Sequence, residues 1–318
     1  MVISRNKIGG DIGTGSANPT TYIGGGTINA SAIYVKGVLQ GVIDSNIIKN
    51  NIPSASGFRG IDIDGTPNET GSAQNIEITR NTIYNLGATS GYAVGIRVGL
   101  SETNRSINIS NNIIAKIYGT GTSAPNVLGS PAGIAIESPV VASGVVNIGV
   151  NLIHNTIHLS QHPTVQVNSG AYSTALYIDP RAAGITSRSN IFSNTYGRTI
   201  AGTVSNALAV TVGGTQNPFI ESNTNVYFTG GNPNFTNNII GLVTPNVQLP
   251  SLAELRSLYG FETSSKFGEV PFLTDSTNNM DLMYVGHISK SVVRNGSVVL
   301  DIAGNPRDFE ATVGALEI

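Results

Sequence analysis

The feature that most constrains this chain is a repeated pattern of isoleucine and asparagine. In its clearest form, residues 76–83 read Ile-Glu-Ile-Thr-Arg-Asn-Thr-Ile. Ile76 and Ile78 alternate with polar residues. Asn81 follows three positions after Ile78, and Ile83 follows two positions after Asn81. This alternation is typical of a strand with one buried face, and the asparagine marks a polar corner before a second strand.

The corner recurs along most of the chain at intervals of 31 to 43 residues, at Asn6, Asn46, Asn81, Asn112, Asn155, Asn190 and Asn225. A second pattern alternates with it, in which a small residue precedes an apolar-x-apolar strand, starting at Ala32, Gly60, Gly95, Gly133, Ala175 and Ala207. Strands this short cannot bury a face alone, but stacked about 4.8 Å apart they share one core. The pattern therefore predicts an all-β, right-handed parallel β-helix of about seven coils.

The corner asparagines are expected to be structural. A side-chain amide has donors and acceptors enough to bond the coils above and below it, and this satisfies a buried corner at every level. We therefore assign no activity to these residues.

The repeat weakens after residue 236, and the sequence predicts a β-helix over 1–236 followed by a C-terminal cap over 237–318. Residues 251–260 predict the one clear helix, with Ser251 as N-cap, Glu254 completing a capping box and Gly260 as the stop. Its apolar stripe consists of Leu252, Leu255 and Tyr259. Such a helix would help to cover the open end of the stack.

Composition excludes several classes of function. The chain has no cysteine, so disulfides, zinc-thiolate sites and thiol nucleophiles are absent. A formal net charge of -2 gives no basic footprint for nucleic acid. No apolar run is long enough to span a bilayer. Because the chain opens directly on the repeat, we expect a piece cut from a larger protein; the oligomeric expectation is a monomer or such a fragment.

The tail contains Glu-Val-Pro-Phe at 269–272, Asp-Leu-Met at 281–283, Asp-Ile-Ala-Gly-Asn-Pro-Arg at 301–307 and Gly-Ala-Leu-Glu at 314–317. These motifs resemble the C-terminal module of bacterial surface proteins common in Bacteroidetes, and the repeats resemble those of pectate-lyase-like β-helix proteins. Residues 288–296 depart from that module. The resemblance implies a β-helix fold and an extracellular or cell-surface location, but it does not fix a reaction, because such proteins include lyases, hydrolases and adhesins.

Outward positions of the second strand pattern are the candidate functional residues, because stacking aligns them into columns. One column is expected to contain Tyr34, Asp62, Arg97, Ala135, Tyr177 and Ala209; the next is expected to contain Lys36, Asp64, Gly99, Glu137, Asp179 and Thr211. If the chain is an enzyme, Asp62, Asp64, Arg97 and Glu137 would hold Ca²⁺ and abstract a proton next to a uronate carboxylate. The loop 118–131 would then wall a groove. The alternative is a solvated face of weak ion pairs.

Two other sets of residues are weighed in the same way. Tyr34, Lys36, Tyr177 and Asp179 are candidate contacts for a glycan. His154, His158 and His162 are expected to be surface or cap residues, because a strand, corner and strand do not bring such residues onto one face as metal ligands. We therefore predict no metal site from them.

These observations favour a non-catalytic structural or adhesive scaffold with a polysaccharide or cell-surface partner. The alternative is a polysaccharide lyase or glycoside hydrolase that acts on an acidic polysaccharide, with Ca²⁺ as the cofactor if it is a lyase.

Overall fold

The computed structural model describes residues 1–8, 31–51, 57–65, 73–124, 128–138, 144–162, 164–196, 206–230, 240–243, 247–268, 272–275, 280–284, 292–293, 298, 300–307, 310–311 and 314–315. The expected boundary at 236, most of the departure at 288–296 and parts of the motifs at 269–272 and 314–317 fall outside these residues. Within them, no helix is long and apolar enough to cross a membrane.

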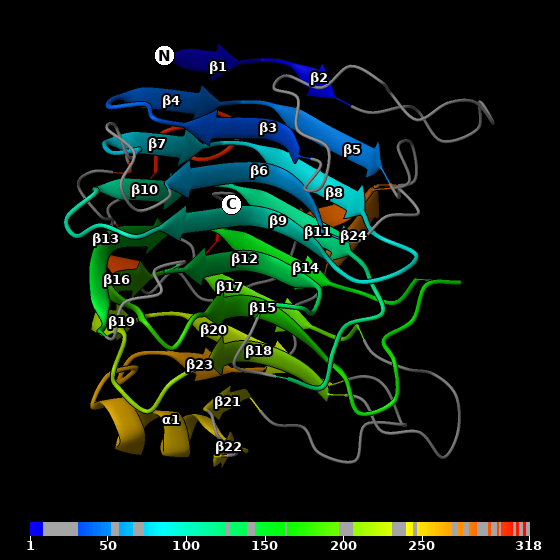
Figure 1. The fold of residues 1–318 in the computed structure, drawn as a ribbon, viewed down its shortest axis with the longest axis vertical. Coiled ribbons are helices and arrows are strands. Elements are labelled where there is room, and N and C mark those ends of the chain that lie inside the picture. Colours follow the sequence, from blue (N-terminus) through cyan, green and yellow to red (C-terminus); the bar gives the residue numbers. More distant parts are fainter. Residues whose placement is uncertain are drawn as a thin grey trace.

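Three parallel sheets form a β-solenoid, in which the strands of each sheet stack along the long axis (Figure 1). Sheet A consists of β1 (Val2–Ser4), β4 (Gly41–Asp44), β7 (Ile76–Thr79), β10 (Ile107–Ser110), β13 (Val146–Ile153), β16 (Ala182–Arg188) and β19 (Phe219–Asn223). Sheet B consists of β2 (Lys7–Ile8), β5 (Ile47–Asn51), β8 (Thr82–Leu86), β11 (Ile113–Ile117), β14 (Thr156–Leu159), β17 (Ile191–Asn194), β20 (Val226–Thr229) and β23 (Lys266–Phe267).

Sheet C consists of β3 (Ser31–Lys36), β6 (Phe58–Gly65), β9 (Ala93–Leu100), β12 (Ala132–Glu137), β15 (Tyr172–Ile178), β18 (Asn206–Val212), β21 (Gly241–Val243) and β22 (Val247–Leu249). Only β21 and β22 pair antiparallel within it. Each turn of the solenoid contributes one strand to each sheet, so the predicted all-β parallel stack is confirmed.

The solenoid has about 5 turns, fewer than the seven coils that the corner asparagines predict. The difference lies at the two ends of the stack, where the strands are short. At the N-terminal end β1 and β2 have 3 and 2 residues, and at the other end sheet C closes with β21 and the antiparallel β22.

Aligned apolar side chains fill the interior. In sheet B, Ile48, Ile83, Ile114, Ile157, Phe192 and Tyr227 follow one another in register. All of them are buried in one continuous cluster with the inward residues of sheets A and C. The core is therefore a column of like side chains, as the repeat pattern requires.

The corner between sheets A and B has a constant geometry. The residue before each corner asparagine has a left-handed backbone, with φ between 55° and 57°, at Arg5, Ser45, Arg80, Asn111, His154, Ser189 and Thr224. Each asparagine then donates its side-chain amide to the side-chain oxygen of the next, and Asn112 and Asn155 are typical at 3.0 Å. Backbone N–H groups bond the same oxygens, as from Asn112 to Asn155 at 3.1 Å. The corner asparagines therefore form a continuous hydrogen-bonded ladder along the stack.

Helix α1 (Leu252–Tyr259) lies at the end of the stack opposite the N-terminus (Figure 1). The hydroxyl of Ser251 accepts from the backbone N–H of Ala253, and Gly260 ends the helix with a left-handed backbone. The predicted stripe of Leu252, Leu255 and Tyr259 is buried. The helix therefore has the caps and the buried face that its sequence predicts.

Two small antiparallel pairs complete the described fold, β24 (Phe272–Asp275) with β25 (Met280–Tyr284), and β26 (Val292–Val293) with β27 (Glu310–Ala311).

Described residues near the C-terminus pack against the middle of the solenoid. We call the described residues from 298 to 315 the C-terminal clasp. Within it Arg307 is buried and donates to the side-chain oxygen of Asn111 at 2.7 Å and to the carbonyl of Gly314 at 2.8 Å. The backbone N–H of Ala315 donates to the hydroxyl of Thr156 at 2.9 Å. The clasp thus binds across the outer side of the corners of two coils.

Gly314 fits this contact because it lacks a side chain. Its φ is 93°, and a Cβ placed on it would lie 2.6 Å from the hydroxyl oxygen of Thr156. Any other residue would therefore push the clasp away from the solenoid.

Candidate functional site

The outward column that begins at Tyr34 aligns as expected over five coils, as far as Tyr177. Tyr34 pairs with Asp62, Asp62 with Arg97, and Arg97 with Ala135. The column fails at β18, where Tyr177 pairs with Thr211 rather than Ala209. The expected alignment of β18 was therefore wrong by two residues. Ala207-Leu208 has the same sequence pattern as Ala175-Leu176, but in the structure Val210, not Leu208, pairs with Leu176 in the core.

The four candidate catalytic residues form one ion-pair cluster around Arg97. Its Nη1 lies 2.8 Å from Asp62 Oδ1 and 3.3 Å from Asp64 Oδ1. Its Nε donates to Glu137 Oε2. One guanidinium therefore contacts three carboxylates from the neighbouring strands β6 and β12.

This cluster is far more buried than the solvated face expected from the sequence. Asp62 is only 1% exposed, and its second oxygen accepts from the Ser31 hydroxyl at 3.2 Å. That oxygen also lies 3.5 Å from Nη1 of the buried Arg59. Asp62 is thus held by two arginines and a hydroxyl, which leaves it poorly placed to accept a proton from a substrate.

Charge balance within the cluster follows from these contacts. Burial alone would lower the pKa of the Arg97 guanidinium, but Asp62 and Glu137 outweigh burial and raise that pKa above its ordinary value. At the edge of the cluster the Tyr34 hydroxyl donates to Asp64 Oδ2 at 2.8 Å. Partial burial of the ring and this bond to Asp64 raise the pKa of Tyr34. Arg97 therefore stays charged and Tyr34 stays neutral at any physiological pH.

The arrangement does not favour a cation site. The guanidinium already occupies the place between the carboxylates that Ca²⁺ would take, and Ca²⁺ needs six to eight oxygen ligands. Among the described residues no group of three His, Cys, Asp or Glu side chains could hold a metal ion.

The predicted glycan contacts divide into two pairs. Tyr34 and Lys36 are exposed on β3, whereas Tyr177 is 3% and Asp179 6% exposed. Asp179 accepts from the backbone N–H of Arg181 at 3.0 Å, and Leu128 packs with Tyr177 in a small outer cluster. Leu128 belongs to the loop 118–131, whose residues 125–127 lie outside the described part. The structure therefore does not bring the four predicted contacts together on one open face.

The expectation of surface histidines is wrong for His154. It is fully buried at the left-handed position of its corner, and the clasp contacts Asn111 and Thr156 beside it. His158 bonds the Ser193 hydroxyl at 3.0 Å. His162 packs edge-on against Tyr118, with ring centroids 4.3 Å apart. These three side chains have separate surroundings and do not form a site.

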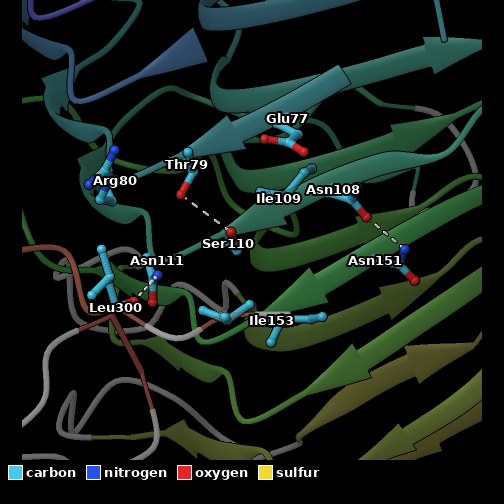
Figure 2. A pocket seen from close by; sticks show the side chains of 11 residues that line it. Glu77, Thr79, Arg80, Asn108, Ile109, Ser110, Asn111, Asn151, Ile153 and Leu300 are labelled. Atoms are coloured by element: carbon cyan, nitrogen blue, oxygen red, sulfur yellow. Dashed lines mark hydrogen bonds between the residues drawn. The ribbon is translucent and has the colours of Figure 1, made fainter. Parts of the chain in front are cut away.

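A pocket of about 280 Å³ lies elsewhere, between the outer face of sheet A and the C-terminal clasp (Figure 2). Its lining residues come from three neighbouring strands and the clasp: Glu77, Thr79, Arg80, Asn108, Ile109, Ser110, Asn111, Asn151, Ile153, Val298 and Leu300. Reasoning from the sequence missed this pocket. One residue in the sequence could have indicated it. Ile153 is apolar, whereas the residues aligned with it on the other strands of sheet A are polar: Asp44, Thr79, Ser110, Arg188 and Asn223.

Comparison with known protein families, with curated proteins and with solved structures finds no match for this chain. The resemblance noted in the sequence is therefore supported at the level of a β-solenoid fold and no further.

Proposed function

We propose that this chain is a non-catalytic β-solenoid scaffold, a structural or adhesive part of a bacterial cell-surface or secreted protein. The observation that carries the proposal is the contact of Arg97 with Asp62, Asp64 and Glu137. A lyase needs a free general base close to the substrate, and a hydrolase needs a carboxyl pair of which one member can give up a proton. Here the candidate carboxylates already neutralise a buried cation.

The Asn ladder supports the same proposal. It fixes every coil relative to the next along the long axis, and a stiff rod of constant cross-section suits a stalk or spacer. The exposed end of the sheet C column, with Tyr34 and Lys36, is the part of that face that remains open to a surface partner.

The surface location rests on the tail. Asp301, Gly304, Arg307 and Gly314 are the residues that the resemblance singles out, and they build or anchor the clasp. Labelling of intact source cells with a reagent that does not cross membranes tests this part, and labelling only after lysis would overturn it. The chain alone is expected to elute as a monomer in size-exclusion chromatography.

A polysaccharide assay tests the absence of catalysis. The purified chain is incubated with acidic and neutral polysaccharides, with and without Ca²⁺, and new double bonds and new reducing ends are followed. No product above the buffer blank is expected. Turnover that disappears in Arg97→Met but persists in Arg188→Met, a variant of a partly exposed, paired arginine on sheet A outside the pocket, would establish the enzyme instead.

A further inference from the structure

The pocket on sheet A has a regular polar floor. Glu77, Asn108 and Asn151 occupy equivalent outward positions on three successive strands, in direct register. Thr79 and Ser110 form a second row beside them, and their hydroxyls lie 3.4 Å apart (Figure 2). Because coils stack about 4.8 Å apart, the floor is a grid of hydrogen-bonding groups with fixed spacing.

The two asparagines keep free bonding capacity. Asn151 donates its amide to the side-chain oxygen of Asn108 at 2.7 Å (Figure 2). An amide side chain has two donor hydrogens and one accepting oxygen. Among the described residues, the Asn108 amide nitrogen and the Asn151 oxygen have no protein partner. The pair therefore offers a donor and an acceptor side by side, which matches a hydroxyl group that both accepts and donates.

The wall of the pocket is apolar. Ile153 points outward next to Ser110, and Val298 and Leu300 of the clasp line the opposite side. Asn111 ties this wall to the floor, because its amide donates to the carbonyl of Leu300 at 2.6 Å. A ligand with polar edges and apolar C–H faces fits between such a floor and such a wall.

Charge in the pocket disfavours anions. The one cation in the lining, Arg80, makes a bidentate pair with Asp44 at 2.8 and 2.7 Å, so its charge is already neutralised. Glu77 is exposed and has no ion-pair partner among the described residues. The net charge is therefore negative, and a carboxylate ligand such as a uronate would be repelled.

We propose that this pocket binds a neutral saccharide unit, with its hydroxyls on Glu77, Asn108 and Asn151 and one C–H face against Ile153 and Leu300. The volume lies near the lower limit of small-molecule pockets, about 300 Å³, so one end of a longer glycan fits rather than an extended chain. This inference rests on the proposed function in that a bound glycan is not turned over, but it places the contact on sheet A instead of sheet C.

Saturation-transfer NMR tests the site with the purified full chain and three probes: cellobiose, lactose and digalacturonate. At least one neutral disaccharide is expected to bind, and digalacturonate is not. Asn151→Ala is expected to weaken that binding about tenfold, which corresponds to the loss of one or two hydrogen bonds. Thr186→Ala is the matched control, since Thr186 follows Asn151 in the same column but lies outside the pocket, and it is expected to leave binding unchanged.

The outcomes separate this site from the proposed function. The pocket is overturned if neither neutral disaccharide binds, if digalacturonate binds more tightly, or if Asn151→Ala binds as the wild type does. Binding lost in Tyr34→Ala but kept in Asn151→Ala would overturn the pocket while leaving an adhesive scaffold in place. Cleavage of either disaccharide would instead overturn the non-catalytic function.

Discussion

Asn225 donates its side-chain amide to both carboxylate oxygens of Glu262, at 3.3 and 3.4 Å. Asn225 is the last member of the corner ladder, in which every asparagine donates toward the C-terminal end. A ladder of this polarity ends on donors, and a buried carboxylate is the acceptor that satisfies them. Glu262 also accepts from the hydroxyl of Tyr227 at 2.6 Å and from the hydroxyls of Ser222 and Ser265.

Replacing Glu262 tests this termination. In Glu262→Leu, four buried donors lose their acceptor, and the free energy of unfolding is expected to fall by about 3–5 kcal/mol. Glu262→Gln keeps the shape and one accepting oxygen, so its loss should be about 1–2 kcal/mol. Urea unfolding followed by circular dichroism measures both. A leucine variant as stable as the wild type would mean that the ladder needs no terminal acceptor.

Asn112→Leu tests the ladder in its middle. The substitution removes acceptor and donor contacts to Asn81 and Asn155 and leaves buried backbone groups unpaired, which should cost about 3–5 kcal/mol of unfolding free energy. Asn6→Leu is the matched comparison at the partly exposed first corner and should cost about 1 kcal/mol. If the two variants lose the same unfolding free energy, the contribution of a corner asparagine to stability does not depend on its burial.

Arg307→Met tests the clasp. The variant loses the bonds to Asn111, Gly314 and Ala315, so the clasp should detach while the solenoid remains folded. Hydrogen exchange is expected to speed up in residues 300–315 and to stay slow in β10 and β14. Arg181→Met, in which a partly exposed arginine is removed, serves as the control. Unchanged exchange in 300–315 would mean that Arg307 does not anchor the clasp.

His162 should give stability a dependence on pH. Burial, with a smaller effect of Lys116, lowers its pKa, and its Nδ1 accepts backbone N–H groups of Thr164 and Val165 at 3.2 and 2.9 Å. The unfolded chain takes up a proton near pH 6.5, whereas the folded chain resists it. Stability should therefore fall as the pH drops below about 6.5, by at most about 1.4 kcal/mol per pH unit.

The same measurement in His162→Gln isolates this contribution. Glutamine keeps an accepting oxygen but does not titrate, so thermal unfolding between neutral and mildly acidic pH should lose the part of the slope that His162 supplies. Identical slopes in the two proteins would contradict the assignment.

The fold was predictable from the sequence because every coil packs against an equivalent coil, so the same types of residue recur at equivalent positions. Asn81 and its equivalents recur for that reason. The helix 252–259 was predictable because Ser251 and Gly260 are typical capping residues. The predicted right-handedness of the solenoid stays a prediction.

The features that the sequence did not predict depend on contacts that do not recur from coil to coil. Glu262 follows the helix without any repeat, and Arg307 meets Asn111 from 196 positions away. The burial of Asp62 and Tyr177 likewise could not be read from alternation, because alternation distinguishes inward from outward positions but does not indicate whether another segment covers the outward face. The pocket on sheet A has the same origin, since its wall is the clasp.

The central claim is that the charges on sheet C are structural, and a double-mutant cycle between Arg97 and Asp62 tests it most directly. Arg97→Met, Asp62→Asn and the double variant are unfolded in urea, beside the same cycle for the more exposed pair of Arg80 and Asp44. A coupling energy of about 2–3 kcal/mol is expected for the first pair and about 0.5 kcal/mol for the second. Additive effects at Arg97 and Asp62, with a coupling below about 0.5 kcal/mol, would contradict the account.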